Sequence, residues 1–229
     1  MKPKAWSHTA LDNFENCPKQ YYEVKVEQRW PFSSTAEMEW GKSVHRAFEH
    51  YLLYGTPMSA DLDMHRDFLD RFKAEPGEIK GEERIALNTA LQPCGYFDKA
   101  PKPEVWYRGQ VDAQKRDKVS GISHILDHKT GRVKNDFTQL KSFAMWEFIA
   151  HPEIHTVNVE FYWTQIRGAA GETYRREQLP EILSFFAAKL HRYADAFLTG
   201  VFPAKQSGLC NGWCPVTDCE FWRPKRAKP

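Results

Sequence analysis

One segment near the middle of the chain has the alternating side chains that are typical of a β-strand. In residues 105–112, a mainly apolar set of side chains alternates with a mainly polar set. Successive side chains of a strand point to opposite faces, so this segment predicts a strand. Residues 116–121 predict a turn, and residues 122–127 predict the strand that returns beside the first. This part of the chain therefore predicts a β-hairpin.

The segments on either side of this hairpin predict helices and a second hairpin. Apolar residues recur at helical spacing in several of them, and Ser, Asp, Pro or Gly residues mark their ends. Helices are predicted over residues 7–17, 37–54, 61–74, 82–91, 137–150 and 180–199. A second pair of strands is predicted over residues 157–163 and 172–179, with a turn at 168–171. The order of helices, hairpin, helix, hairpin and helix predicts an α/β domain with a mixed central sheet flanked by helices.

Length and composition restrict the class of protein. At about 100–200 residues per domain, the 229 residues allow one domain, or one domain with an appendage, and we predict a single domain, 1–229. The 32 basic and 30 acidic residues give a formal charge of +2, which excludes a histone-like polycation but leaves local basic patches open. No apolar run approaches the roughly 20 residues of a membrane span, and no apolar segment of a signal peptide follows the N-terminal lysines. We therefore expect a cytoplasmic protein without membrane contact.

A cluster of charged residues is predicted on the central hairpin. Asp127 and Lys129 are two residues apart, so their side chains leave a strand on the same face, and Asp112 on the partner strand can reach that face. One or two carboxylates suffice to hold Mg²⁺ together with water and phosphate oxygens. Such a cation lowers the pKa of a bound water, and the Lys129 ammonium can orient that water or stabilise developing charge. The alternative interpretation is a cross-strand ion pair on a solvated sheet face.

His45 is a candidate ligand from a different element. It lies four residues after Gly41, beside the apolar stripe of the predicted helix 37–54. As a metal ligand it would favour Mn²⁺ as well as Mg²⁺, since imidazole suits transition-metal ions. The alternative is a core histidine whose hydrogen bonds are satisfied within the protein.

Four of the five cysteines stand near the two ends of the chain, at Cys17, Cys210, Cys214 and Cys219. The odd cysteine count and the lack of an export signal argue against a disulfide scaffold. Four thiolates complete either a Zn²⁺ site or an iron–sulfur cluster, so segments 1–22 and 201–222 are expected to join at one metal centre. The alternative is a set of buried free thiols. Cys94 stands outside this pattern and is interpreted as structural.

The order of these motifs along the chain resembles one nuclease family. Gly-x-x-x-His ends at His45, and Gly-x-x-Asp ends at Asp112. Asp-x-Lys-Thr-Gly then begins at Asp127, and Gln139 stands on the next predicted helix. This order is similar to the RecB-like branch of the PD-(D/E)XK nuclease superfamily, which includes the Cas4 exonucleases and many phage nucleases. The opening segment 6–22, with Cys-Pro followed by an aromatic pair, is similar as well.

The resemblance implies a fold and a role for each motif residue. The implied fold is the restriction-endonuclease-like core, an α/β domain with a mixed sheet. The resemblance implies that His45, Asp112 and Asp127 bind Mg²⁺ or Mn²⁺ together with the backbone carbonyl of His128. It also implies that Lys129 is catalytic.

The resemblance extends to the following helix and to the cysteines. It implies that Gln139 helps to position the DNA strand or the water. The family usually has Tyr where this chain has Phe143, so a role of that hydroxyl is not expected here. The Cas4 nucleases hold a 4Fe–4S cluster with one N-terminal and three C-terminal cysteines in a C-x2-C-x5-C spacing. The C-x3-C-x4-C spacing of this chain leaves Zn²⁺ open as the alternative for Cys17, Cys210, Cys214 and Cys219.

Together these expectations describe a metal-dependent DNA nuclease. We expect an exonuclease that hydrolyses phosphodiester bonds of single-stranded DNA in recombination, repair or phage DNA metabolism. A phage origin would place it in the host cytoplasm. The alternative is a non-catalytic DNA-binding or scaffold module of a recombination complex. Such a module need not keep the complete set His45, Asp112, Asp127 and Lys129.

Overall fold

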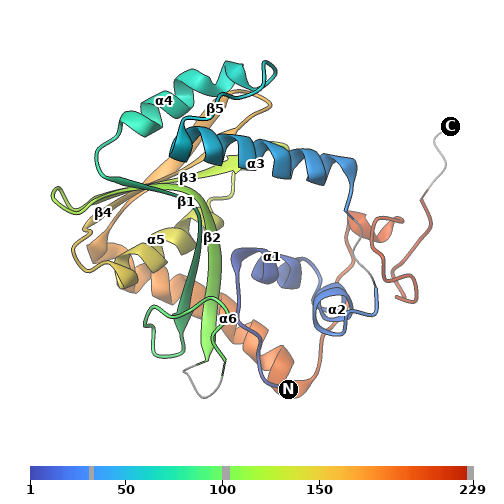
Figure 1. The fold of residues 1–229 in the computed structure, drawn as a ribbon. Coiled ribbons are helices and arrows are strands. Elements are labelled where there is room, and N and C mark those ends of the chain that lie inside the picture. The colour runs from blue at the N-terminus through green and yellow to red at the C-terminus, as the bar shows by residue number, and fades with distance from the viewer. Residues whose placement is uncertain (31–33, 100–103, 226–229) are drawn as a thin grey trace. The chain divides into compact units, whose positions relative to one another are not determined.

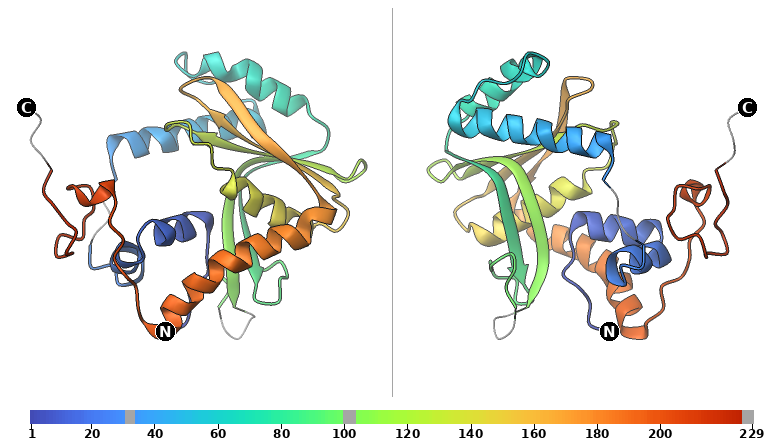
Figure 2. Two further views of the ribbon diagram at one scale, coloured as in Figure 1. Left: turned by 180° about the vertical axis from the view of Figure 1, so that it is seen from behind. Right: turned by 45° about the vertical axis from the view of Figure 1, so that its right-hand side comes forward.

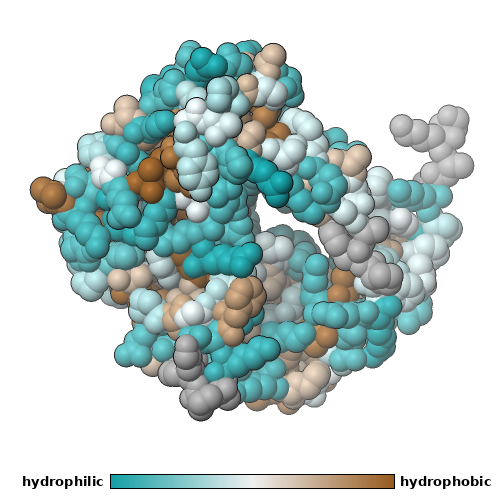
Figure 3. Space-filling model, in the orientation of Figure 1, coloured by the Kyte–Doolittle hydropathy of each residue, from teal (hydrophilic) through white to brown (hydrophobic). Residues whose placement is uncertain are grey.

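The computed structural model describes residues 1–30, 34–99 and 104–225 of the chain (Figure 1). The chain forms two compact units, one of Thr35–Ser184 and one of Met1–Ser34 with Phe185–Pro229. Among the described residues, no helix has the length and apolar character needed to cross a membrane. The face shown in Figure 3 is mostly hydrophilic, with hydrophobic residues scattered over it.

The larger unit is built on a mixed sheet of five strands. In spatial order the strands are β1 (Glu78–Asn88), β2 (Val105–Asp117), β3 (Ile122–Lys129), β4 (Thr156–Trp163) and β5 (Gly168–Arg175). Neighbouring strands are antiparallel except β3 and β4, which run parallel. Parallel strands need a crossover connection, and helix α5 (Thr138–Ala150) provides it. The predicted mixed sheet with flanking helices is thus confirmed.

Helices cover both faces of this sheet. Helices α3 (Ala36–Tyr54) and α4 (Arg66–Ala74), joined through the short 3₁₀ helix η2 (Asp63–His65), lie on one side and α5 on the other (Figures 1 and 2). Ala113 belongs to the apolar cluster under α3 and α4, whereas its neighbour Gln114 donates a hydrogen bond to Glu147 of α5. One face of β2 therefore packs against α3 and α4, and the other contacts α5.

Helix α3 has clear start and stop signals. The Thr35 hydroxyl accepts a hydrogen bond from the Met38 N–H, and Gly55 ends the helix in the left-handed conformation at φ 69°. Its buried residues Val44, Phe48 and Leu52 form the inward face, as their spacing predicts. This packing fixes the rotation of the helix, and His45, the neighbour of Val44, is thereby placed at the edge of the buried stripe.

The smaller unit contains the two ends of the chain. Its elements are α1 (His8–Asn16), α2 (Pro18–Tyr21), the π-helical turn η1 (Tyr22–Val26), η4 (Gly208–Cys210) and the part of α6 (Leu179–Thr199) that begins at Phe185. The rings of Phe14 and Tyr21 pack against Tyr193 of α6, and the Tyr21 and Tyr193 hydroxyls are 2.7 Å apart. The N-terminal and C-terminal segments thus share one core.

Two local predictions are wrong. The predicted helix over 82–91 is strand β1, and the predicted turn at 168–171 is the first half of β5, which is followed by η3 (Arg176–Gln178). Residues 82–84 are good helix formers, but pairing with β2 overrides this weak preference. Gly171 is needed for close strand pairing, because a Cβ there would lie 1.9 Å from the carbonyl oxygen of Val159.

A buried ion pair ties β2 to α5. The Arg116 guanidinium donates from Nε to Glu147 Oε1 at 2.7 Å and from Nη2 to Oε2 at 2.8 Å. Gln114 adds a third hydrogen bond to the same carboxylate, and the Glu147 side chain is fully buried. All bonding positions of this carboxylate lie inside the protein, so a change at Glu147 leaves the buried Arg116 with only the more distant Glu83 carboxylate, 3.8 Å away.

Glu147→Gln is therefore expected to destabilise the protein by about 3–5 kcal/mol, the usual cost of breaking a buried ion pair. Urea denaturation followed by circular dichroism measures the change. The matched control is Glu153→Gln, because Glu153 forms an exposed pair with Lys118 at 3.3 Å and its loss should change little. Equal stabilities of the two variants would contradict the prediction.

Candidate active site

A pocket of about 1350 Å³ lies in the larger unit beside the N-terminal half of α3. The predicted site residues His45, Asp112, Asp127, Lys129 and Gln139 all line it. Gly41 of α3 faces Thr130, and a Cβ at this position would lie 3.0 Å from the Thr130 hydroxyl oxygen. A small residue at position 41 therefore lets the helix come close to the end of β3.

The site lies where β2 and β3 separate. Their pairing ends at Ala113 and Leu126, and the next residues in this register are Asp112 and Asp127. Beyond this point β2 stays paired only with β1, and β3 only with β4. The backbone N–H of His128 donates a hydrogen bond to Asp112 Oδ2 at 2.7 Å, in place of a hydrogen bond to the β2 backbone. The separation opens space for side chains between the two strands.

Asp127, Lys129 and Gln139 form a closed triangle of polar contacts. Lys129 Nζ lies 2.5 Å from Asp127 Oδ2 and donates to Gln139 Oε1 at 2.8 Å, while Gln139 Nε2 donates to Asp127 Oδ1 at 2.7 Å. The sequence prediction that Asp127 and Lys129 share one face is confirmed. In this structure the Gln139 amide is hydrogen-bonded to the Lys129 ammonium and to the Asp127 carboxylate.

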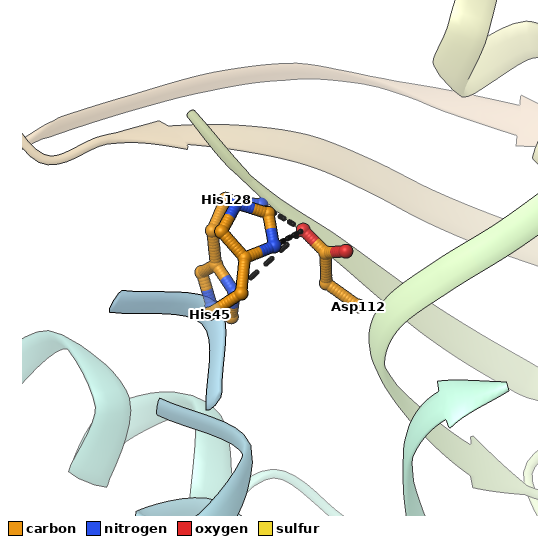
Figure 4. A group of neighbouring side chains, drawn as sticks. All are labelled: His45, Asp112 and His128. Carbon is orange, nitrogen blue, oxygen red and sulfur yellow. Dashed lines mark hydrogen bonds and ion pairs between the residues drawn. The ribbon is translucent and has the colours of Figure 1, made fainter. Parts of the chain in front are cut away.

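A second group surrounds the carboxylate of Asp112. His45 Nδ1 lies 3.2 Å from Asp112 Oδ2, and His128 Nδ1 lies 3.7 Å from the same oxygen. One ligand atom from each of His45, Asp112 and His128 lies within 4.8 Å of the others. Figure 4 shows both imidazole rings beside this carboxylate oxygen. Among the described residues, this is the one group of three or more His, Cys, Asp or Glu side chains with the spacing of a metal site.

Glu82 joins this site, and the sequence analysis did not predict it. Gly81 pairs with Ala113 and Glu83 with Val111, so Glu82 falls opposite Asp112 in the register. Its backbone has a φ of 46°, which is unusual for a residue other than glycine, and Glu82 Oε1 lies 4.0 Å from His45 Nδ1. The segment was interpreted as helix, and a helix would not have placed Glu82 opposite Asp112. Only the pairing of β1 with β2 shows that Glu82 belongs to the site.

The charges of the pocket favour a bound cation. Burial and the negative charge of Asp112 raise the pKa of Asp127 to about 7, and the same two causes raise the pKa of Glu82. Burial opposes ionisation of Asp112, but its hydrogen bond with His45 and the charges of His45 and His128 lower its pKa overall. Three carboxyl groups therefore compete for negative charge in one pocket. Carboxylate oxygens and imidazole nitrogens suit a divalent cation, so the donor set fits the metal that the sequence predicts.

The cysteines lie in the smaller unit, with the exception of Cys94 in the larger one. The side chains of Cys17, Cys210, Cys214 and Cys219 line a single small pocket. The expected four-thiolate cluster is not formed at metal-ligand spacing, because no three of their sulfur atoms in the described chain lie within 4.8 Å of one another. Burial and the nearby sulfur atoms of the other three raise the pKa of the Cys214 thiol. None of the five cysteines forms a disulfide.

A family model of the PD-(D/E)XK nuclease superfamily matches residues 5–219. The chain belongs to this superfamily. No curated protein sequence matches the chain. Two solved structures are similar to this PD-(D/E)XK chain. The first is a "Putative exonuclease" from Eubacterium rectale, with 13% identity, a TM-score of 0.55, and coverage of 99% of this chain and 90% of the other. The second is SSO0001, with 12% identity, a TM-score of 0.38, and coverage of 92% and 84%.

These comparisons set the general class of the protein. At 13% identity the Eubacterium rectale structure supports the fold alone. The family match identifies the chain as a PD-(D/E)XK nuclease, a class that uses divalent metal ions. The predicted superfamily and the predicted nuclease class are confirmed.

Proposed function

We propose that this PD-(D/E)XK nuclease is a divalent-metal-dependent exonuclease of single-stranded DNA. The observation that carries the proposal is the meeting of His45, Asp112, Asp127 and Lys129 in one pocket, at the separation of β2 and β3. A non-catalytic module need not keep this complete set in one place. We further propose that both compact units belong to one domain, because the family model spans both.

Each residue has a proposed task in hydrolysis. His45, Asp112, Asp127 and the backbone carbonyl of His128 would hold the divalent cation. When bound, it would supply positive charge beside the phosphate and lower the pKa of water. The Lys129 ammonium stabilises charge that develops on the phosphate in the transition state. Gln139 holds Lys129 and Asp127 in register through its amide, as the hydrogen bonds at 2.8 and 2.7 Å indicate.

Basic side chains around the pocket support a nucleic-acid substrate. The pocket lining includes Lys42 and Arg46 of α3, Arg84 of β1 and Arg132 after β3. Cationic side chains bind phosphates without regard to base sequence. A strand entering the pocket would therefore have counter-charges for the phosphates on either side of the cleaved bond.

An exposed tryptophan at the same pocket supports a single-stranded substrate. Trp40 lines the pocket five residues before His45 on α3, and 46% of its surface is exposed. An exposed indole of this kind can stack on an unpaired base, whereas bases in a duplex are already stacked. Trp40 would then hold a nucleotide next to the phosphodiester bond that is cleaved.

Trp40→Ala is expected to weaken binding of single-stranded DNA by roughly 5- to 150-fold, since one stacked base contributes about 1–3 kcal/mol. Binding of a blunt duplex should change little. Fluorescence anisotropy with a labelled oligonucleotide measures both, in an Asp127→Asn background that keeps the strand intact. Tyr54→Ala is the control, because Tyr54 is an exposed aromatic residue of the same helix outside the pocket. An equal loss for single strands and duplex would argue against stacking.

Digestion of end-labelled DNA tests the proposed activity. Linear single strands, linear duplexes and closed circular single strands are incubated with Mg²⁺ or Mn²⁺, and a chelator serves as the blank. We expect cation-dependent release of nucleotides from linear single strands and no cutting of the circle. Cutting of the circle, which has no ends, would indicate an endonuclease and reject the proposed exonuclease activity. No cleavage of any DNA would reject the proposed function.

We also propose that Cys17, Cys210, Cys214 and Cys219, which line one small pocket, hold a 4Fe–4S cluster. Backbone N–H groups of Gln20 and Lys205 donate to Cys17 Sγ at 3.5 and 3.4 Å, and the Ser207 N–H donates to Cys210 Sγ at 3.4 Å. Hydrogen bonds to sulfur stabilise the negative charge of thiolate ligands. Zinc would hold four sulfurs about 3.8 Å apart, given Zn–S distances of ~2.3 Å. A cluster binds each thiolate to a separate iron, so its sulfurs lie farther apart than those of a zinc site, and no three of these four sulfurs, all in the described part of the chain, lie within 4.8 Å of one another.

A further inference from the structure

We propose that the imidazole ring of His128 is itself a ligand of the active-site cation, beside His45 and Asp112, and that it makes the site selective for Mn²⁺ over Mg²⁺. This inference rests on the metal-dependent nuclease function proposed above. It goes further because the motif resemblance assigns only the backbone carbonyl of His128 to the metal.

The first observation is that the His128 ring has no hydrogen-bond partner within the described structure. The residue is 2% exposed, and both ring nitrogens are buried without a partner. A neutral imidazole carries one N–H donor and one lone pair, and buried groups of both kinds are almost always satisfied. An unsatisfied buried pair of nitrogens therefore indicates a missing partner, such as an ion or a water.

His65 provides a comparison from the same unit. It is also buried, with 3% exposure, but its Nδ1 lies 2.8 Å from the Tyr162 hydroxyl. A structural histidine in this core is thus satisfied by a protein partner. His128 packs against Phe48, with ring centroids 4.9 Å apart, and this contact satisfies neither nitrogen. Packing alone does not explain why position 128 carries an imidazole.

The second observation is the placement of the ring. His128 Nδ1 lies 3.7 Å from Asp112 Oδ2, and His45 Nδ1 lies 3.2 Å from the same oxygen (Figure 4). The backbone N–H of His128 donates a hydrogen bond to this oxygen at 2.7 Å, so the carboxylate is fixed beside the ring. Ligand atoms of one metal ion lie about 3–4 Å apart when each is about 2.1 Å from the metal. The spacing within 4.8 Å needs only a small closure of the three side chains around an ion.

The donor set predicts which ion is preferred. Mg²⁺ prefers oxygen ligands and keeps much of its water, whereas imidazole suits Mn²⁺ and the later transition-metal ions. With one imidazole the site would serve either ion. A second imidazole shifts the preference towards Mn²⁺, and this shift is the measurable consequence of the proposal.

The test uses the full chain and two readouts other than nuclease activity. Pulsed electron paramagnetic resonance of bound Mn²⁺ detects the nitrogen atoms of coordinated imidazoles, and equilibrium titrations give the Mn²⁺ and Mg²⁺ affinities. In the unaltered protein we expect two coordinated imidazoles and a preference for Mn²⁺ of at least about tenfold. His128→Phe fills the same volume without nitrogen. It should remove one nitrogen signal and lower Mn²⁺ affinity by roughly 10–100-fold, with a smaller effect on Mg²⁺.

The matched control is His124→Phe. His124 lies on the same strand, outside the pocket, and its Nε2 pairs with Glu160 at 3.2 Å. Its replacement should leave the Mn²⁺ affinity and the nitrogen signals unchanged. A single coordinated imidazole in the unaltered protein would overturn the inference while leaving the proposed nuclease intact, and this measurement needs no variant to fold. Absence of any Mn²⁺ or Mg²⁺ binding would overturn the proposed function as well.

Discussion

Asp127→Asn is expected to reduce DNA cleavage by roughly 10²–10³-fold or more. The change removes a proposed metal ligand and the negative partner of Lys129, whose ammonium lies 2.5 Å from it. Lys129 then loses its ion pair with residue 127 and keeps its hydrogen bond to Gln139. Lys129→Met should cause a loss of similar size, because it removes the positive charge itself. Rates of release from a 5′-labelled single strand with Mn²⁺ measure both variants.

The fold should survive these changes. Asp127 and Lys129 are at the wall of an open pocket, and circular dichroism with thermal unfolding checks that each variant is folded. The matched control is Asp117→Asn, because Asp117 ends β2 and lies outside the pocket. Folded Asp127→Asn protein that retains activity within tenfold of the unaltered protein would contradict the assignment of the catalytic pocket.

Cys214→Ser is expected to remove the proposed 4Fe–4S cluster and to lower the stability of the smaller unit. Protein purified without oxygen should be brown and contain iron and labile sulfide, and the variant should lose both. Ligand binding to the folded state alone adds to its stability, so loss of the cluster acts directly on unfolding. A loss of about 3 kcal/mol would lower the melting temperature by roughly 6–12 °C for a chain of this size.

Cys94→Ser is the control for this prediction, because Cys94 lies in the larger unit and outside the cysteine pocket. It should leave colour, iron content and melting temperature unchanged. Colourless protein with one zinc ion per chain would reject the cluster and keep the four-thiolate site. Protein without either metal, and with an unchanged melting temperature in Cys214→Ser, would reject the site itself.

Local patterns in the sequence were enough to predict most elements and part of the pocket. Alternation over residues 105–112 predicts β2, because the period of two is a local property of an extended chain. The turn at 116–121 then predicts β3 as the returning strand. The same period predicts that Asp127 and Lys129 share a face, which their ion pair confirms. Helical spacing likewise predicts α3 and the position of His45 beside its buried stripe.

The remaining features depend on contacts between distant segments. Strand β1 contains good helix formers, and only its pairing with β2 makes it a strand and sets Glu82 opposite Asp112. The end of β2–β3 pairing at Ala113 and Leu126 opens the pocket, and no local pattern marks that point. The burial of His128 is likewise decided by packing against Phe48 of α3. The sequence by itself indicated His45, Asp112, Asp127 and Lys129 as candidates for the chemistry, because spacing along a strand or helix is local. Only the tertiary structure decided which of them meet, because meeting depends on how separate elements pack.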